Sequence, residues 1–120
     1  MKSQDPADPA DHNPRLLLPE SATTAFELLS RRWVLQLLYL LCQSEARFNE
    51  LAHAMPTISH RVLMERLRTL QHEGLIHRNV DPGPLTRITY RITDLGSSLW
   101  PSLQHANTWG AQYLTTNHPT

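Results

Sequence analysis

The chain of 120 residues lacks several features that mark exported and membrane proteins. Its one cysteine, Cys42, cannot form an internal disulfide, and such cysteine usage is typical of a reducing compartment. The longest apolar run, Trp33–Cys42, is interrupted by Gln36 and is shorter than the roughly 20 apolar residues that span a bilayer. The N-terminus has no charged-then-apolar signal pattern. We therefore expect a cytoplasmic protein that does not enter a membrane.

Motifs for catalysis and metal binding are also lacking. The sequence contains no glycine-rich phosphate loop, no G-x-S-x-G motif and no suggestive pair of carboxylates. None of the seven histidines has the spacing typical of a zinc site. Cys42 has no neighbouring histidine or cysteine and lies in an apolar segment, so we expect a buried, unreactive thiol. We therefore predict no enzymatic activity, no cofactor and no metal site.

Charge is distributed unevenly, although the net charge of the chain is zero. Residues 1–30 carry two basic and five acidic side chains, a balance of −3. Residues 31–120 carry nine arginines, no lysine and six acidic side chains, a balance of +3. Arginine is the side chain best suited to bidentate contact with phosphate and guanine. The pattern indicates a modestly basic body behind an acidic start, which is compatible with a nucleic-acid partner.

Composition divides the chain into three parts. Residues 1–20 contain four prolines and repeated aspartates, which predict a flexible N-terminal arm. Residues 21–114 form the expected folded domain, and residues 115–120 form a C-terminal tail.

Two helices are expected at the start of the folded domain. Ser21 is the expected N-cap of a first helix that runs through Ser30, with Phe26 on its inner face. A second helix, from about Arg32 to Gln43, is apolar over most of its circumference. We expect this second helix to be the centre of the core.

The next segment has the pattern of a helix-turn-helix. A short helix is expected over Arg47–Ala54, because Pro56 stops it. Ser59 is the expected N-cap of a second helix that ends at Gly74, a residue suited to a left-handed C′ position. The spacing of Leu63, Leu67 and Leu70 predicts that one face of this second helix is buried.

A β-hairpin and a long final helix follow. Strands are expected over Leu75–Val80 and Arg87–Ile92, the second with alternating apolar and polar residues. One helix is expected over Asp94–Leu114, bent or weakened at Pro101. A helix-turn-helix followed directly by a hairpin is a winged helix, whose commonest use is DNA binding. The predicted fold class is therefore mainly α with a small β-hairpin.

The exposed face of the Ser59-capped helix predicts contacts with double-stranded DNA. Its first half is expected in the major groove, with His60 and Arg61 on bases and Ser59 on a phosphate. Arginines of the hairpin would reach phosphates or the minor groove, unless they only keep an exposed strand soluble. The predicted DNA-binding residues are Arg47, Ser59, His60, Arg61, Met64, Glu65, Arg68, Arg78, Arg87 and Arg91.

The final helix carries an apolar stripe that is longer than one small core can cover. An exposed stripe of this kind usually contacts a partner, so we predict a homodimer. The predicted dimerisation residues are Leu99, Leu103, Ala106, Trp109 and Tyr113.

Several short motifs occur in a characteristic order, namely Trp33, Arg47-Phe48-Asn49-Glu50-Leu51, Ile58-Ser59, Gly74-Leu75-Ile76-His77-Arg78 and Thr93-Asp94-Leu95-Gly96. With them the chain resembles the HxlR-type winged helix-turn-helix regulators of bacteria, relatives of the MarR group, over about two-thirds of its length. The resemblance implies a homodimer built by N- and C-terminal helices. It also implies that two recognition helices face a pseudo-palindromic operator.

The sequence departs from that family at a residue pair used in sensing. Many members carry an N-terminal Cys-Pro that responds to electrophiles or oxidants, whereas the matching region here reads His12-Asn13-Pro14. Redox sensing by this route is therefore not expected. A small-molecule effector could act through a cavity near Trp33, Tyr39 or Trp109, and a protein-interaction module with an acidic partner is the other alternative.

Overall fold

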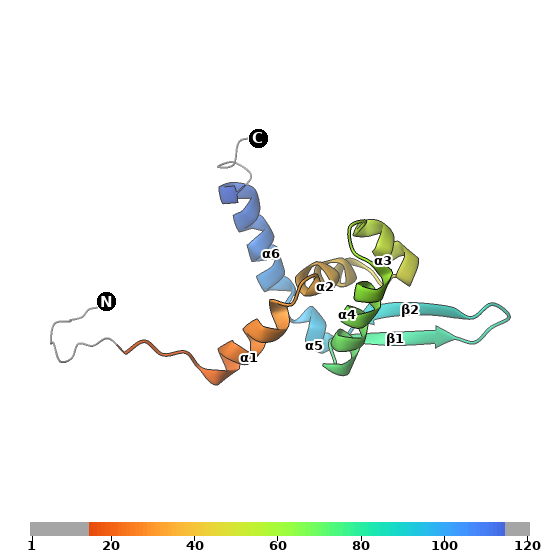
Figure 1. The fold of residues 1–120 in the computed structure, drawn as a ribbon, viewed down its shortest axis with the longest axis horizontal. Helices are drawn as coiled ribbons and strands as arrows, with labels where there is room; N and C mark the ends of the chain where they lie inside the picture. The colour runs from red at the N-terminus through yellow and green to blue at the C-terminus, as the bar shows by residue number, and fades with distance from the viewer. Residues whose placement is uncertain (1–14, 115–120) are drawn as a thin grey trace.

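A computed structural model describes residues 15–114, so the predicted tail and the first fourteen residues of the arm lie outside the described part. The elements are α1 (Glu20–Leu29), α2 (Val34–Gln43), α3 (Phe48–Ala54), α4 (His60–His72), β1 (Ile76–Asp81), β2 (Arg87–Ile92), α5 (Asp94–Ser97), α6 (Trp100–Trp109) and the π-helical turn η2 (Gly110–Leu114). The predicted class, mainly helical with one antiparallel hairpin, is confirmed (Figure 1).

Helix α2 is the centre of the core, as its apolar sequence predicts. Four of its side chains are buried, namely Val34, Leu37, Leu38 and Leu41. Leu63, Leu67 and Leu70 of α4 are also buried, because their spacing brings them to one helix face. Each such leucine contributes roughly 1.5–3 kcal/mol by leaving water. This common core holds α4 in place and leaves its opposite face in solvent.

The ends of α4 have the predicted capping residues. The hydroxyl of Ser59 accepts a hydrogen bond from the backbone N–H of Val62 at 3.1 Å, which satisfies one of the free donors of the first helical turn. After the helix, Gly74 adopts a φ of 80°, a conformation that costs glycine little. Each residue acts on backbone atoms close to it in sequence, so both ends of α4 could be predicted from the sequence.

The hairpin pairs β1 and β2 in register from Ile76 opposite Ile92 to Asp81 opposite Arg87. Strand β1 therefore begins one residue later than the sequence predicted and extends into the expected turn. Ala46, between α2 and α3, adds an isolated bridge to Tyr90, with hydrogen bonds of 3.0 and 2.7 Å. This bridge ties the base of the hairpin to the start of the helix-turn-helix.

The Thr93-Asp94-Leu95-Gly96 motif has a structural explanation. The hydroxyl of Thr93 accepts a hydrogen bond from the Gly96 N–H at 3.1 Å and donates one to the Gly74 carbonyl at 2.7 Å. Any Cβ at Gly96 would collide with the backbone carbonyl of Leu75. Glycine is required there because helix α5 and the turn between α4 and β1 approach at backbone distance.

Two predictions for the N-terminal helices are wrong. Helix α1 begins at Glu20, with Pro19 rather than Ser21 at the N-cap and no side-chain cap. Phe26 is 61% exposed instead of facing inward, because α1 packs on the core only through Leu28 and Leu29, both partly buried. Helix α2 starts at Val34, after Trp33 takes a left-handed φ of 78°.

The predicted single helix over Asp94–Leu114 is also wrong, because it is broken after α5. Pro101 has no N–H to donate to the carbonyl of Ser97, so a continuous helix would lose that bond. The helix restarts instead at Trp100, which places Pro101 in the first turn of α6, where a missing donor costs nothing. The break lets α6 leave the core in a direction of its own (Figure 1).

Candidate nucleic-acid interface

The exposed face of α4 carries the predicted base-reading residues. His60, Arg61 and Arg68 are exposed, whereas Met64 and Glu65 are half-buried. The guanidinium of Arg61 forms an ion pair of 2.7 Å with the carboxylate of Glu65, one helical turn later. Because both groups are solvent-exposed, this pair is worth at most about 1 kcal/mol. Arg61 can therefore exchange Glu65 for another acceptor at low energetic cost.

The first residue of α4 is oriented by the first residue of α3. The rings of Phe48 and His60 meet edge to face, with centroids 5.2 Å apart and an interplanar angle of 90°. Phe48 is half-buried, and its ring contacts the exposed His60 at the N-terminus of α4. The Glu50 carboxylate accepts a hydrogen bond from the Arg47 N–H at 2.8 Å, so Arg47 is the N-cap of α3.

The hairpin register separates its arginines onto two faces. Arg78 lies opposite the buried Tyr90 and shares its face, whereas Arg87 and Arg91 lie on the other face. Arg78 meets Arg68 of α4 at a hollow of about 320 Å³ between the helix and the hairpin. No ion pair neutralises either arginine within residues 15–114. The structure thus brings Arg78 to the α4 side and leaves Arg87 near the hairpin tip.

Sequence reasoning missed Arg66, which lies on α4 but points away from the exposed face. Its Nε donates a hydrogen bond of 2.8 Å to the backbone carbonyl of Arg32, in the turn between α1 and α2. The side chain is 23% exposed and also lies 3.9 Å from Glu65. The available signal was its position three residues after Leu63, at the edge of the buried stripe.

The predicted dimerisation stripe divides into two parts. Leu103 is buried in the core of its own chain and Leu99 is packed against that core. Ala106, Trp109 and Tyr113 are exposed, Trp109 by 54%. Two further exposed apolar residues lie on α1 and α2, namely Phe26, which the sequence predicted to face inward, and Leu35, which it did not single out. Between α2 and α6, beside Tyr39, lies an apolar groove of about 490 Å³.

The remaining chemistry-bearing groups form no site. Cys42 is half-buried, and burial raises the pKa of its thiol. Within residues 15–114, no three histidine, cysteine, aspartate or glutamate side chains are placed to hold a metal ion. No helix of this described part is long and apolar enough to cross a membrane.

A helix-turn-helix whose second helix presents an exposed polar face beside an arginine-bearing hairpin defines a winged-helix DNA-binding protein. The HxlR-like helix-turn-helix family model matches residues 28–118, and the chain belongs to that family. It is a transcriptional regulator of the HxlR type.

Known relatives agree with this assignment. YvaP of Bacillus subtilis, an uncharacterized HTH-type transcriptional regulator, is 39% identical over 90 residues, which cover 75% of this chain and 83% of YvaP. The reduced form of the transcriptional regulator YodB from B. subtilis has a TM-score of 0.74 at 27% identity, over 85% of this chain and 100% of YodB. The redox regulator HypR, in its reduced form, has a TM-score of 0.73 at 27% identity, over 78% of this chain and 92% of HypR. These relatives are regulators, which favours the predicted non-enzymatic role.

Proposed function

We propose that the chain binds a pseudo-palindromic operator as a homodimer, with one α4 helix in each of two successive major grooves. The observation that carries this proposal is the placement of α4. Its apolar face is buried in the core, while His60, Arg61 and Arg68 project from the opposite face beside the hairpin. A helix held in this way is rigid enough to present base-reading side chains at defined positions.

The two arginine faces of the hairpin support a division of roles. His60 and Arg61 read bases from the first turn of α4, and the Ser59 end of the helix meets a phosphate. Arg78 works with Arg68 on the α4 side, whereas Arg87 contacts backbone phosphates from the tip. Arg47 at the N-cap of α3 and Arg91 on the Arg87 face of the hairpin add further phosphate contacts, and the half-buried Met64 and Glu65 of α4 complete the proposed set.

Dimerisation is supported by exposed apolar side chains on the two helices that leave the core. Figure 1 shows α1 and α6 projecting away from the hairpin end of the molecule. Phe26 is 61% exposed and Trp109 is 54% exposed, which is costly for aromatic residues left in water. A partner that covers them also provides the spacing of about 34 Å that successive major grooves require.

The experiment that tests this function is selection of DNA fragments by the purified full chain, followed by binding at several salt concentrations. The proposal expects one enriched inverted-repeat sequence, bound by a dimer, with a salt slope of about −0.9 per phosphate neutralised. A winged-helix module for an acidic protein partner would also bind DNA with salt dependence, but without enriching any sequence. Absence of an enriched sequence would therefore favour that alternative.

Control by a small-molecule effector is supported by the groove between α2 and α6. Its lining is mainly apolar, and it includes Tyr39, whose ring contacts Trp100 at a centroid distance of 5.0 Å. A volume of about 490 Å³ lies within the range of small-molecule sites. Leu35→Trp would fill the groove from α2, so effector response should be lost while effector-free operator binding is retained.

A further inference from the structure

The direction of α1 depends on the short turn that joins it to α2. No side chain of α1 is fully buried, and only Leu28 and Leu29 pack against the core near the end of the helix. The turn reverses the chain through hydrogen bonds from Arg31 N–H to the Leu28 carbonyl and from Val34 N–H to the Arg31 carbonyl. Since few contacts hold the rest of α1, a small change in this turn moves the whole helix.

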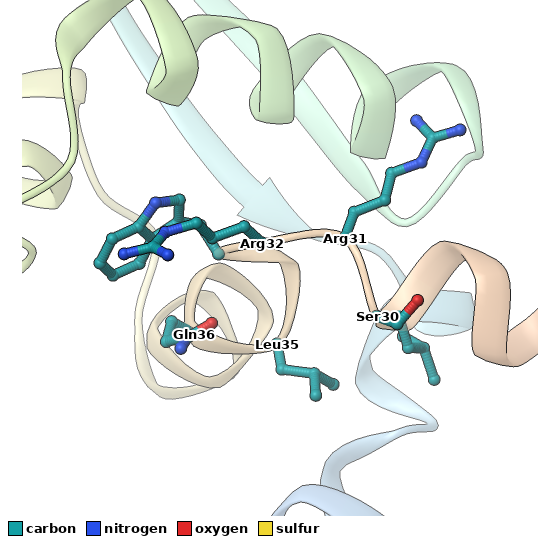
Figure 2. Close-up of a pocket in the computed structure, with 7 residues that line it drawn as sticks. Ser30, Arg31, Arg32, Leu35 and Gln36 are labelled. Carbon is teal, nitrogen blue, oxygen red and sulfur yellow. The ribbon is translucent and has the colours of Figure 1, made fainter.

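The backbone of this turn is strained. Trp33 has a φ of 78°, the one positive value among non-glycine residues in the described part of the chain. Aromatic residues rarely adopt this conformation, and it persists only where surrounding contacts impose it. One such contact is internal, because the guanidinium carbon of Arg32 lies over the Trp33 ring, 5.0 Å from its centroid. The side chains of Arg31 and Arg32 point in different directions, so Arg31 takes no part in this contact (Figure 2).

The other contact comes from the recognition helix. Arg66 lies on α4, and its Nε donates a 2.8 Å hydrogen bond to the Arg32 carbonyl, across 34 residues of sequence. A charged donor makes a stronger bond than a neutral one, and partial burial shields it from water. The carbonyl oxygen of Arg32 in the turn is therefore hydrogen-bonded directly to α4, the helix proposed to read DNA.

We propose that Arg66 is a positioning residue that couples α1 to α4 and thereby sets the separation of the two recognition helices in the dimer. This role rests on the proposed function, in which α1 belongs to the dimer interface and α4 enters the major groove. The Arg66 bond lies where α1 begins to leave the core. A small displacement of this turn therefore becomes a large displacement at the far end of α1. Two helices that must meet successive grooves tolerate little variation in that distance.

A first test measures the separation without DNA. The full chain carries Cys42→Ser and a spin label at His72→Cys, an exposed position at the end of α4, and pulsed electron resonance gives the distance between the two labels. The proposal expects one narrow distance peak, which broadens or shifts with Arg66→Met while the dimer persists. The matched control, Arg68→Met, removes the same charge from the same helix but no bond to the turn, so its peak is unchanged.

A second test uses operators whose half-sites are moved apart or together by one base pair. The wild type should bind most tightly to the half-site spacing found in the selected operator. In Arg66→Met, the ratio of affinities for this spacing and for the altered spacings should fall about fivefold. Arg68→Met should lower affinity equally at every spacing. A folded Arg66→Met dimer with unchanged peak width and unchanged spacing preference would overturn the coupling role alone. A wild-type monomer, or a wild type with no preferred sequence, would overturn the proposed function and this role with it.

Discussion

The hydroxyl of Thr93 lies 2.7 Å from the carbonyl oxygen of Gly74 and joins the end of the hairpin to the end of α4. Thr93 follows β2 and Gly74 follows α4, so this hydrogen bond closes the segment that contains the hairpin. The same hydroxyl accepts from Gly96, and the Thr93 N–H donates to the Leu75 carbonyl at 3.0 Å. The orientation of the hairpin relative to α4 depends on this junction.

Thr93→Val should destabilise the fold, because valine keeps the shape but loses both hydroxyl hydrogen bonds. The expected loss in the free energy of unfolding is about 1–2 kcal/mol, measured by urea denaturation. Thr89→Val is the matched control, because Thr89 lies within β2 and its hydroxyl does not take part in the hydrogen bonds at this junction. Its expected change stays within about 0.5 kcal/mol. Equal stability of the two variants would contradict this account of the junction.

Arg61→Ala should relax base preference at one operator position and cost about 1–3 kcal/mol of binding free energy. Arg61 lies in the first turn of α4, where helix residues reach base edges, and its pairing with Glu65 is exposed and weak. Binding to a set of operators with single base changes measures this preference. If affinity falls equally on all of them, Arg61 contacts phosphate and does not read a base.

Arg87→Ala should weaken binding to all DNA sequences alike and reduce the salt slope by about one unit. Arg87 begins β2 at the tip of the hairpin, away from the base-reading turn of α4. Arg61→Ala and Arg87→Ala control for each other, because each removes one arginine. The first is expected to change base preference, and the second to change the salt dependence. Titration at several salt concentrations separates them, and an unchanged slope for Arg87→Ala would remove it from the interface.

Trp109→Glu should convert the dimer to a monomer, because the interface would bury a carboxylate without a partner. Trp109 is 54% exposed in the single chain and its ring lies 6.1 Å from that of Tyr113. Gln104→Glu is the control, since it adds the same charge to an exposed position on the opposite side of α6. Sedimentation velocity distinguishes the two, and a Trp109→Glu dimer of wild-type affinity would rule out this interface.

Cys42 should not act as an oxidation switch. Burial raises the pKa of its thiol, so less reactive thiolate forms near neutral pH than at an ordinary cysteine. Alkylation by iodoacetamide should therefore be slow at pH 7 and accelerate only as the pH rises above the usual thiol range. Peroxide or diamide should leave operator affinity unchanged, with Cys42→Ser as the control. A reversible loss of binding on oxidation that Cys42→Ser abolishes would contradict this prediction.

The helix-turn-helix and the hairpin could be predicted because their signals are local. Ser59 and Gly74 cap α4 through atoms within a few residues, and the leucine spacing of α4 identifies its buried face without reference to any other element. Alternation along β2 identifies the strand in the same way. The exposed polar face of α4 follows from the same periodicity, so most of the candidate DNA surface was visible in the sequence.

The exposure of Phe26, the close approach of Gly96 to Leu75 and the bond from Arg66 to Arg32 were decided only by the tertiary structure. Whether an apolar helix face is buried depends on what packs against it, and α1 lacks a neighbour over most of its length. Gly96 must approach the backbone carbonyl of Leu75, a constraint set by a residue 21 positions earlier in the chain. Arg66 finds its acceptor 34 residues away. Sequence periodicity describes one element at a time, whereas these features arise from contacts between elements.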